Sequence, residues 1–122
     1  MARVAGAGPG AVAALGHRAV DGAEHLDDAA RQVIGMSARL FNRENGLFDH
    51  SWFADMDDDA RFYWGRGGGW MMMAMAELLS VLPETHADRG KVLEIFRRGA
   101  RGAAETQGSL GLWHQLLDKT DS

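Results

Sequence analysis

Apolar positions along this chain recur at the three- and four-residue spacing of helices, and no segment shows the sustained two-residue alternation of a half-buried strand. The spacing predicts four helices, at about residues 11–20, 26–41, 69–82 and 88–104. The first is built mainly from alanine and glycine, which supply no bulky contacts for packing. The pattern as a whole predicts an all-α protein.

The predicted helices differ in how their apolar residues are distributed. Residues 26–41 and 88–104 each carry one apolar stripe opposite a charged side, which is typical of helices that cover a neighbour with one face. Residues 69–82 are apolar nearly all round, so we expect other elements to cover this helix on several sides. Its methionines cannot share one direction on a helix, and we interpret them as filling an irregular interior: Met71, Met72, Met73 and Met75.

A short internal repeat follows two of the predicted helices. Gly46-Leu47-Phe48-Asp49-His50 comes after the second helix, and Gly111-Leu112-Trp113-His114 comes after the fourth, 65 residues later. Helix pairs that repeat at this interval suggest a ring or array in which each unit buries its face on the next. Because such arrays need more than two units, we expect this chain to hold only a portion of the fold.

The charge balance argues against a nucleic-acid partner. Thirteen Lys and Arg stand against seventeen Asp and Glu, which gives a formal net charge of −4 and leaves no excess of positive charge for a phosphate backbone. There is no cysteine in the sequence, so disulfides and thiolate metal sites are excluded.

No membrane partner is expected either. The most apolar run, Trp70 to Ala76, is followed by Glu77 and is too short to span a bilayer. Near the start of the chain, Pro9 and the glycines around it interrupt any apolar stretch of signal-peptide length. We therefore predict a cytoplasmic protein.

The stretch WGRGGGWMMM, residues 64 to 73, is the main candidate for chemistry. It has no Gly-Lys-Ser/Thr and no complete G-x-G-x-x-G, which argues against a phosphate loop. Glycine N–H groups at a helix start favour an anion, and Arg66 adds a two-pronged contact suited to a carboxylate. Trp64 and Trp70 offer flat faces for a sugar ring. The alternative, in which the glycines allow close helix packing and the tryptophans are core, stays open.

Other polar clusters give weaker signals. His50 lies in a predicted loop and could hydrogen-bond a ligand or have no role, and His114 occupies a comparable place in the second repeat. The acidic run Asp55–Asp59 lacks calcium-loop spacing and is predicted to be a solvated turn. No pattern of a Ser-His-Asp site or a histidine metal pair is found in the sequence, and we expect neither a metal nor a cofactor.

Three stretches together resemble a known enzyme group: NGLFDHSW, then YWGRGGGWMMMAMAELLSVLPETH, then GLWHQLLD. In this order they are similar to the unsaturated glucuronyl and rhamnogalacturonyl hydrolases of glycoside hydrolase families 88 and 105, with family 105 the nearer. The resemblance covers about residues 25 to 119. Each stretch alone is weakly specific, whereas the ordered set is strongly so.

The resemblance implies a portion of an (α/α)6 toroid of helical hairpins, with the ligand in its central funnel. It further implies an oligosaccharide that ends in an unsaturated uronic acid as the substrate. An aspartic acid would protonate the C4–C5 double bond, water would add at C5, and the hemiketal would collapse. Matched by position, the substrate-binding residues are His50, Trp64, Arg66, Gly67 and Trp70.

The N-terminal part departs from the family pattern. The family's acid/base aspartate is expected upstream of the second predicted helix, but no carboxylate precedes Asp21, so the catalytic residue is unassigned. We interpret residues 1–122 as a single partial six-hairpin domain of about four helices in which residues 1–22 match poorly. A non-catalytic carbohydrate-binding fragment and a helical interaction module are the alternatives. Bare hairpin faces would favour self-association.

Overall fold

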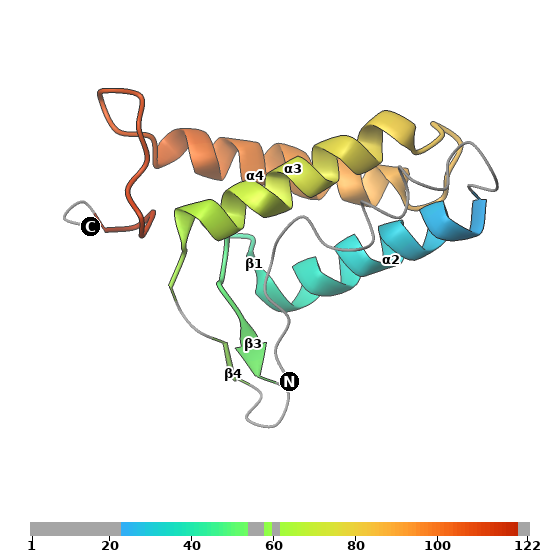
Figure 1. Ribbon diagram of the computed structural model, residues 1–122, viewed down its shortest axis with the longest axis horizontal. Coiled ribbons are helices and arrows are strands. Elements are labelled where there is room, and N and C mark those ends of the chain that lie inside the picture. The colour runs from blue at the N-terminus through green and yellow to red at the C-terminus, as the bar shows by residue number, and fades with distance from the viewer. Residues whose placement is uncertain (1–22, 54–57, 60–61, 120–122) are drawn as a thin grey trace.

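The computed structural model describes residues 23–53, 58–59 and 62–119. This part of the chain is mostly helical, as the apolar spacing predicts (Figure 1). The helices are α2 (Ala23–Leu40), α3 (Gly65–Val81) and α4 (Arg89–Glu105). The strands are β1 (Phe41–Asn42), β2 (Leu47–Phe48), β3 (Trp52–Phe53) and β4 (Asp58–Asp59). The predicted helix at residues 11–20 lies outside the described residues.

Helix α2 begins three residues before the predicted start at Leu26 and ends one residue before the predicted end at Phe41. Its first turn carries Glu24, whose carboxylate complements the positive end of the helix dipole. The predicted stripe is confirmed, because one side of α2 is buried: Leu26, Ala29, Ala30, Val33, Ser37 and Leu40.

Helix α3 begins at Gly65, four residues before the predicted start at Gly69, so the glycines form its first turn and not a turn in front of it. The prediction was wrong because the segment that fixes this start comes from far along the chain. The Gly65 N–H donates to the carbonyl oxygen of Gln115 at 2.8 Å. A Cβ on Gly65 would lie 3.0 Å from the His114 carbonyl oxygen, so glycine lets this segment lie against the helix start.

The core lies where α2, α3 and α4 meet, and its most deeply buried large side chains are Met71, Met75, Leu78 and Val92. Two of the methionines thus fill the interior as predicted. Met73, however, is 49% exposed, and the buried residues of α3 lie on one side only. The expectation that α3 is covered on several sides is wrong for the described part of the chain. Helix α4, predicted at 88–104, covers its neighbours with one face, which includes Val92 and Ile95.

Short strands accompany the helices in the described part of the chain, which stays mostly helical and consistent with the all-α prediction. β1 pairs with β2 and β3 with β4, each antiparallel, in the registers Phe41↔Phe48 and Trp52↔Asp59. Every strand described is two residues long, which is too short for an alternation of polar and apolar residues to be recognised. Asp58 and Asp59, from the predicted solvated turn, form β4, while residues 54–57 lie outside the described ranges.

The two copies of the repeat share one backbone feature. Gly46 follows the last residue of α2, Leu40, by six residues, and Gly111 follows the last residue of α4, Glu105, by six residues. Both glycines have positive φ, 72° and 82°. This left-handed conformation favours glycine, so each copy turns the chain at the same distance from its helix.

Only the first copy is packed. Leu47 and Phe48 are each 4% exposed, whereas Leu112 and Trp113 are 71% and 49% exposed. The first copy lies on α4, where Arg98 donates from Nε to the Arg43 carbonyl oxygen at 3.1 Å and from Nη2 to the Glu44 carbonyl oxygen. A Cβ on Gly102 would lie 2.7 Å from the Asn45 carbonyl oxygen, so glycine on α4 permits this close approach.

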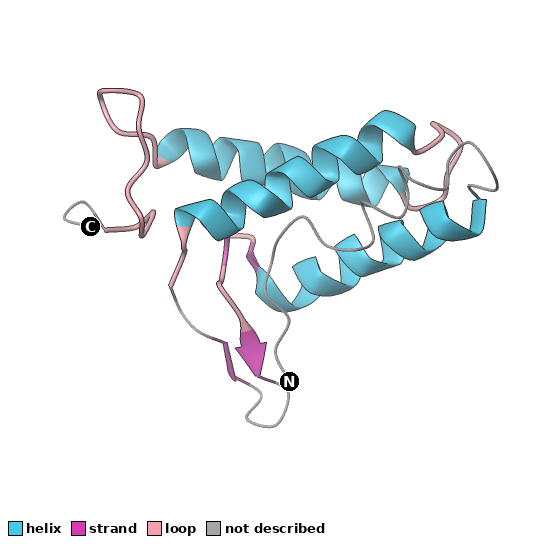
Figure 2. Cartoon of the chain, viewed as in Figure 1, coloured by secondary structure: helices cyan, strands magenta, loops and turns pink. Residues whose placement is uncertain are grey.

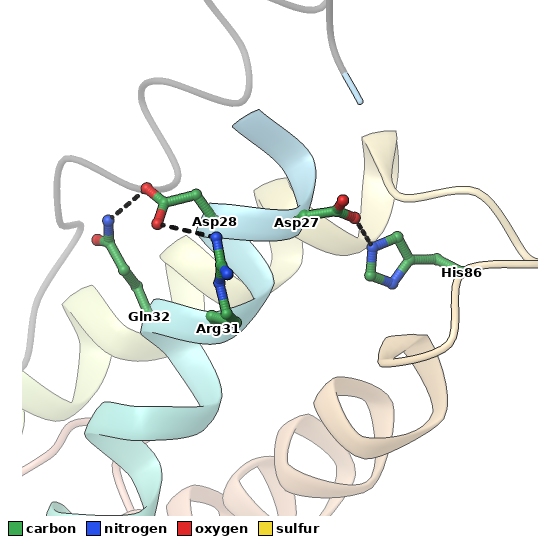
Figure 3. A network of polar contacts seen from close by, with 5 residues as sticks. All are labelled: Asp27, Asp28, Arg31, Gln32 and His86. Atoms are coloured by element: carbon green, nitrogen blue, oxygen red, sulfur yellow. Dashed lines mark hydrogen bonds and ion pairs between the residues drawn. The ribbon is translucent and has the colours of Figure 1, made fainter. Parts of the chain in front are cut away.

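A second link ties the α3–α4 turn to the start of α2 (Figure 3). His86 Nε2 lies 2.6 Å from Asp27 Oδ1, and His86 Nδ1 accepts the Asp88 backbone N–H at 3.1 Å. Because Nδ1 is an acceptor, Nε2 carries the hydrogen and donates it to the carboxylate. This link holds one end of the bundle, and the strands and the longer loops gather at the other end, where α3 begins (Figure 2).

Candidate functional site

Three of the five predicted site residues come together at the start of α3. His50 meets the ring of Trp64 edge-on, with centroids 5.3 Å apart and planes at 83°. The guanidinium carbon of Arg66 lies 4.5 Å from the centroid of the same Trp64 ring, within the range of a cation–π contact. The indole of Trp64 is thus the centre of a His–Trp–Arg cluster.

Phe62 completes this cluster and was missed by the sequence analysis. Its ring stacks on His50 with centroids 5.0 Å apart, and its carbonyl oxygen accepts the His50 backbone N–H at 3.1 Å. The only signal in the sequence is the aromatic density of Phe62-Tyr63-Trp64. Tyr63 is itself held, since its hydroxyl oxygen accepts a hydrogen bond from Asn42 Nδ2 at 3.0 Å. The segment that carries Trp64 is therefore fixed on both sides.

His50 has a buried nitrogen whose hydrogen-bonding capacity is unused. Nδ1 is inaccessible to solvent and has no hydrogen-bond partner in the structure. Buried polar atoms in folded proteins are nearly always paired, so an unpaired buried nitrogen in the cluster is an uncommon feature.

The first turn of α3 offers backbone donors beside Arg66. The Gly65 N–H is used by Gln115, and the Gly68 N–H donates to the Trp64 carbonyl oxygen at 2.9 Å. Within the described ranges the structure gives no acceptor for the N–H groups of Arg66 and Gly67. Gly67 is buried, whereas the Arg66 side chain is exposed. Free N–H groups at a helix start attract an anion, as the sequence predicts.

Trp70 stands apart from the cluster. It follows Arg66 by four residues, which places both on one side of α3, and it is 44% exposed. No ring contact joins Trp70 to His50 or Trp64 in the described part of the chain. The alternative in which all tryptophans are core is wrong, since Trp70 and Trp113 are both about half exposed, at 44% and 49%. Gly65 does permit a close approach, but of the non-helical segment around His114 and not of a second helix.

The hollows that the structure describes are lined by other residues. One mostly apolar hollow of about 460 Å³ lies between α3 and α4, and its lining includes Gly68, Met72, Ala103 and Trp113. None of His50, Trp64, Arg66, Gly67 or Trp70 lines the hollows described. His114, the other candidate histidine, lies in the segment that pairs with Trp64 through Leu116.

Two further findings bear on the kind of chemistry. No group of three or more His, Cys, Asp or Glu placed to hold a metal ion is found in the described part of the chain. None of the helices between residues 23 and 119 combines the length and the apolar character that crossing a bilayer requires.

The comparison with protein families decides the relationship. The family model of Glycosyl Hydrolase Family 88 matches residues 10–122. The chain belongs to this family. An unsaturated 3S-rhamnoglycuronyl hydrolase of an Alteromonas species is 35% identical over 101 residues, which are 80% of this chain and 24% of the relative. An unsaturated rhamnogalacturonyl hydrolase of Bacillus subtilis is 29% identical over 110 residues, 86% of this chain and 31% of the relative.

Solved structures of the related family 105 share the fold of this family 88 chain. A glycoside hydrolase of family 105 from C. acetobutylicum superposes with a TM-score of 0.85 at 24% identity, over 93% of this chain and 34% of that one. A possible member of family 105 from Salmonella enterica gives a TM-score of 0.85 at 27% identity, over 93% and 31%. The chain thus spans about a third of these structures and about a quarter to a third of the curated relatives.

Proposed function

We propose that this chain carries part of a substrate-binding site of the unsaturated rhamnogalacturonyl hydrolase type. This part is the surface that contacts the uronate. Its ligand would be an oligosaccharide that ends in an unsaturated uronic acid. The observation that carries the proposal is the placement of Arg66, with its guanidinium beside an aromatic ring and at a helix start whose N–H groups are available. A carboxylate can accept from a guanidinium and from such N–H groups together.

The aromatic residues would hold the sugar ring. Arg66 already covers one face of Trp64, so Trp70, which is 44% exposed, offers the more accessible face for the C–H surface of a sugar. His50 packs against Phe62 and Trp64 and would lie beside the bound sugar. The names of both relatives, an unsaturated 3S-rhamnoglycuronyl hydrolase and an unsaturated rhamnogalacturonyl hydrolase, support this class of ligand.

The complete reaction would be hydration of the C4–C5 double bond followed by release of the next sugar. That reaction needs a carboxylic acid to protonate the double bond. No carboxylate precedes Asp21 in this sequence, and Asp21 lies outside the described residues. We propose that the 122-residue chain by itself binds the unsaturated uronate without converting it.

Calorimetric titration of the full chain with an unsaturated uronyl disaccharide tests the binding. We expect Arg66→Ala to weaken affinity by about 10- to 100-fold, the usual cost of deleting a hydrogen bond to a charged group. Arg66→Lys should recover only part of this loss, because an ammonium cannot make the two-pronged contact. Arg97→Ala is the control, since Arg97 is exposed on α4 and has the same charge.

The outcome separates this proposal from a purely structural role. If Arg66→Ala and Arg97→Ala bind the disaccharide equally well, the Arg66 cluster is not the site. If the unsubstituted chain gives no heat of binding at millimolar ligand, the helical interaction module is the better description.

A further inference from the structure

Residues 115–117 directly follow the second copy of the repeat and lie beside the start of α3 (Figure 1). Two backbone hydrogen bonds join the two segments. The Gly65 N–H donates to the Gln115 carbonyl oxygen at 2.8 Å, and the Leu117 N–H donates to the Tyr63 carbonyl oxygen at 2.9 Å. We call residues 115–117 the clamp segment, because its bonds lie on both sides of the last residue before α3.

The clamp segment places Leu116 directly opposite Trp64. The two residues form an antiparallel bridge, and the hydrogen bonds that flank the bridge are made by their neighbours and not by the pair itself. In a pair of this kind the side chains lie on the same face, with Cβ atoms about 4.5–5.5 Å apart. The Leu116 side chain therefore lies beside the Trp64 indole, and both residues are partly buried.

The next leucine of the clamp segment contacts the first turn of α3. A Cβ on Gly65 would lie 3.2 Å from Leu117 Cδ2, and a Cβ on Gly68 would lie 3.9 Å from Leu117 Cδ1. Glycine at position 65 thus leaves room for a leucine against the helix backbone. The clamp segment holds two neighbouring parts of the site, the indole that precedes α3 and the helical turn that carries Arg66.

The Trp64 indole needs such a contact to stay in place. In the described part of the chain, Trp64 has an extended backbone and makes no side-chain capping hydrogen bond to α3. Its ring lies 4.5 Å from the guanidinium carbon of Arg66 and meets His50 edge-on. A tryptophan side chain can rotate about two bonds, so an apolar neighbour that restricts the rotation also fixes the ring under the guanidinium. The position of Leu116 suits that role.

We propose that Leu116 is a positioning residue of the surface that contacts the uronate. It does not touch the sugar. It holds the Trp64 indole in the place where the Arg66 guanidinium lies over the ring, and the guanidinium is thereby oriented for the carboxylate. The effect on the ligand rests on the proposed function, whereas the contact between Leu116 and Trp64 lies within the chain and exists without a ligand.

Proton NMR of the full chain without ligand tests the contact. Protons that lie over the face of an indole resonate upfield of their usual position, and the Arg66 side-chain protons should do so, with their signals identified by their loss in Arg66→Ala. Leu116→Ala should move these signals back toward the usual position, because the indole is then free to rotate. The folded chain gives these signals, so a loss of stability alone does not shift them.

Titration with the unsaturated uronyl disaccharide tests the consequence for binding. We expect Leu116→Ala to weaken the affinity about 3- to 10-fold, less than the loss of Arg66 itself, because the guanidinium is kept but is less well oriented. Leu116→Met should recover both the affinity and the Arg66 signals, since methionine restores the apolar volume. If Leu116→Ala does not fold, Leu116→Val is read in the same way.

Leu110→Ala is the matched control. It deletes the same side chain from a nearby position that is 88% exposed, and it should change neither the Arg66 signals nor the affinity. Arg66 protons at their usual position in the unsubstituted chain, or signals and affinity that Leu116→Ala leaves unchanged, would overturn the proposal. Signals that move in Leu116→Ala while affinity stays the same would also overturn it. If the signals move but the unsubstituted chain binds no disaccharide, the contact stands and the proposed function fails.

Discussion

Arg66 shows how far single residues could be assigned from the sequence. The type of residue and its place beside glycines and tryptophans predicted a carboxylate contact. The sequence did not show that the guanidinium lies over Trp64 or that Phe62 stacks on His50. Those contacts join residues that approach through loop conformation, and no helical or strand periodicity encodes a loop conformation.

Gly46 gives a prediction at the residue scale. Its φ of 72° disfavours any other residue, and a Cβ there would lie 2.6 Å from the Arg98 carbonyl oxygen. Gly46→Ala should therefore lower the free energy of unfolding by about 2–4 kcal/mol, as backbone strain and overlap add. Urea denaturation measures the change.

Gly35 is the matched control for this glycine. It lies inside α2, and a Cβ there would meet nothing within 4 Å. Gly35→Ala should raise the free energy of unfolding by about 0.5–1 kcal/mol, because alanine is the better helix former. If both variants change stability by the same amount and in the same direction, the conformation of Gly46 is not what requires glycine.

The helices themselves were largely predictable, and their ends were not. The apolar stripes predicted the ends of α2 and α4 to within three residues, because the spacing of apolar residues follows the buried face of a helix. The start of α3 was missed by four residues, since the segment around Gln115 that fixes it is fifty residues away in the sequence. The two-residue strands could not be predicted from the sequence, because they are shorter than any alternating pattern of polar and apolar residues.

The link between α2 and the α3–α4 turn gives a prediction at this scale (Figure 3). Asp27→Asn replaces the carboxylate that accepts from His86 Nε2 at 2.6 Å. Because Asp27 is 61% exposed, we expect a modest loss of about 0.5–1 kcal/mol in the free energy of unfolding.

Asp28→Asn controls for the loss of a negative charge near the same helix start. Its carboxylate lies 3.7 Å from Arg31 and accepts from Gln32 at 2.9 Å, both within α2. Thermal or urea unfolding of the two variants should show the smaller effect for Asp28→Asn. A larger effect for Asp28→Asn would mean that charge at the helix start matters more than the His86 link.

At the scale of the whole molecule, the repeat was the most informative feature of the sequence. It indicated hairpins that pack on one another, and the shared positive φ of Gly46 and Gly111 gives its two copies the same turn. The first copy is covered by α4, while Leu112 and Trp113 in the second are 71% and 49% exposed. The chain spans about a third of the family 105 structures on which it superposes.

Proton NMR of the full chain mixed with an unsaturated uronyl disaccharide tests the central claim most directly, because one sample reports both binding and conversion. We predict saturation transfer from the protein to the uronate protons, its loss in Arg66→Ala, and a vinyl proton signal at C4 that stays constant over hours. A decline of the vinyl signal with release of free sugar would contradict binding without conversion. Absence of saturation transfer to the uronate would contradict the binding surface itself.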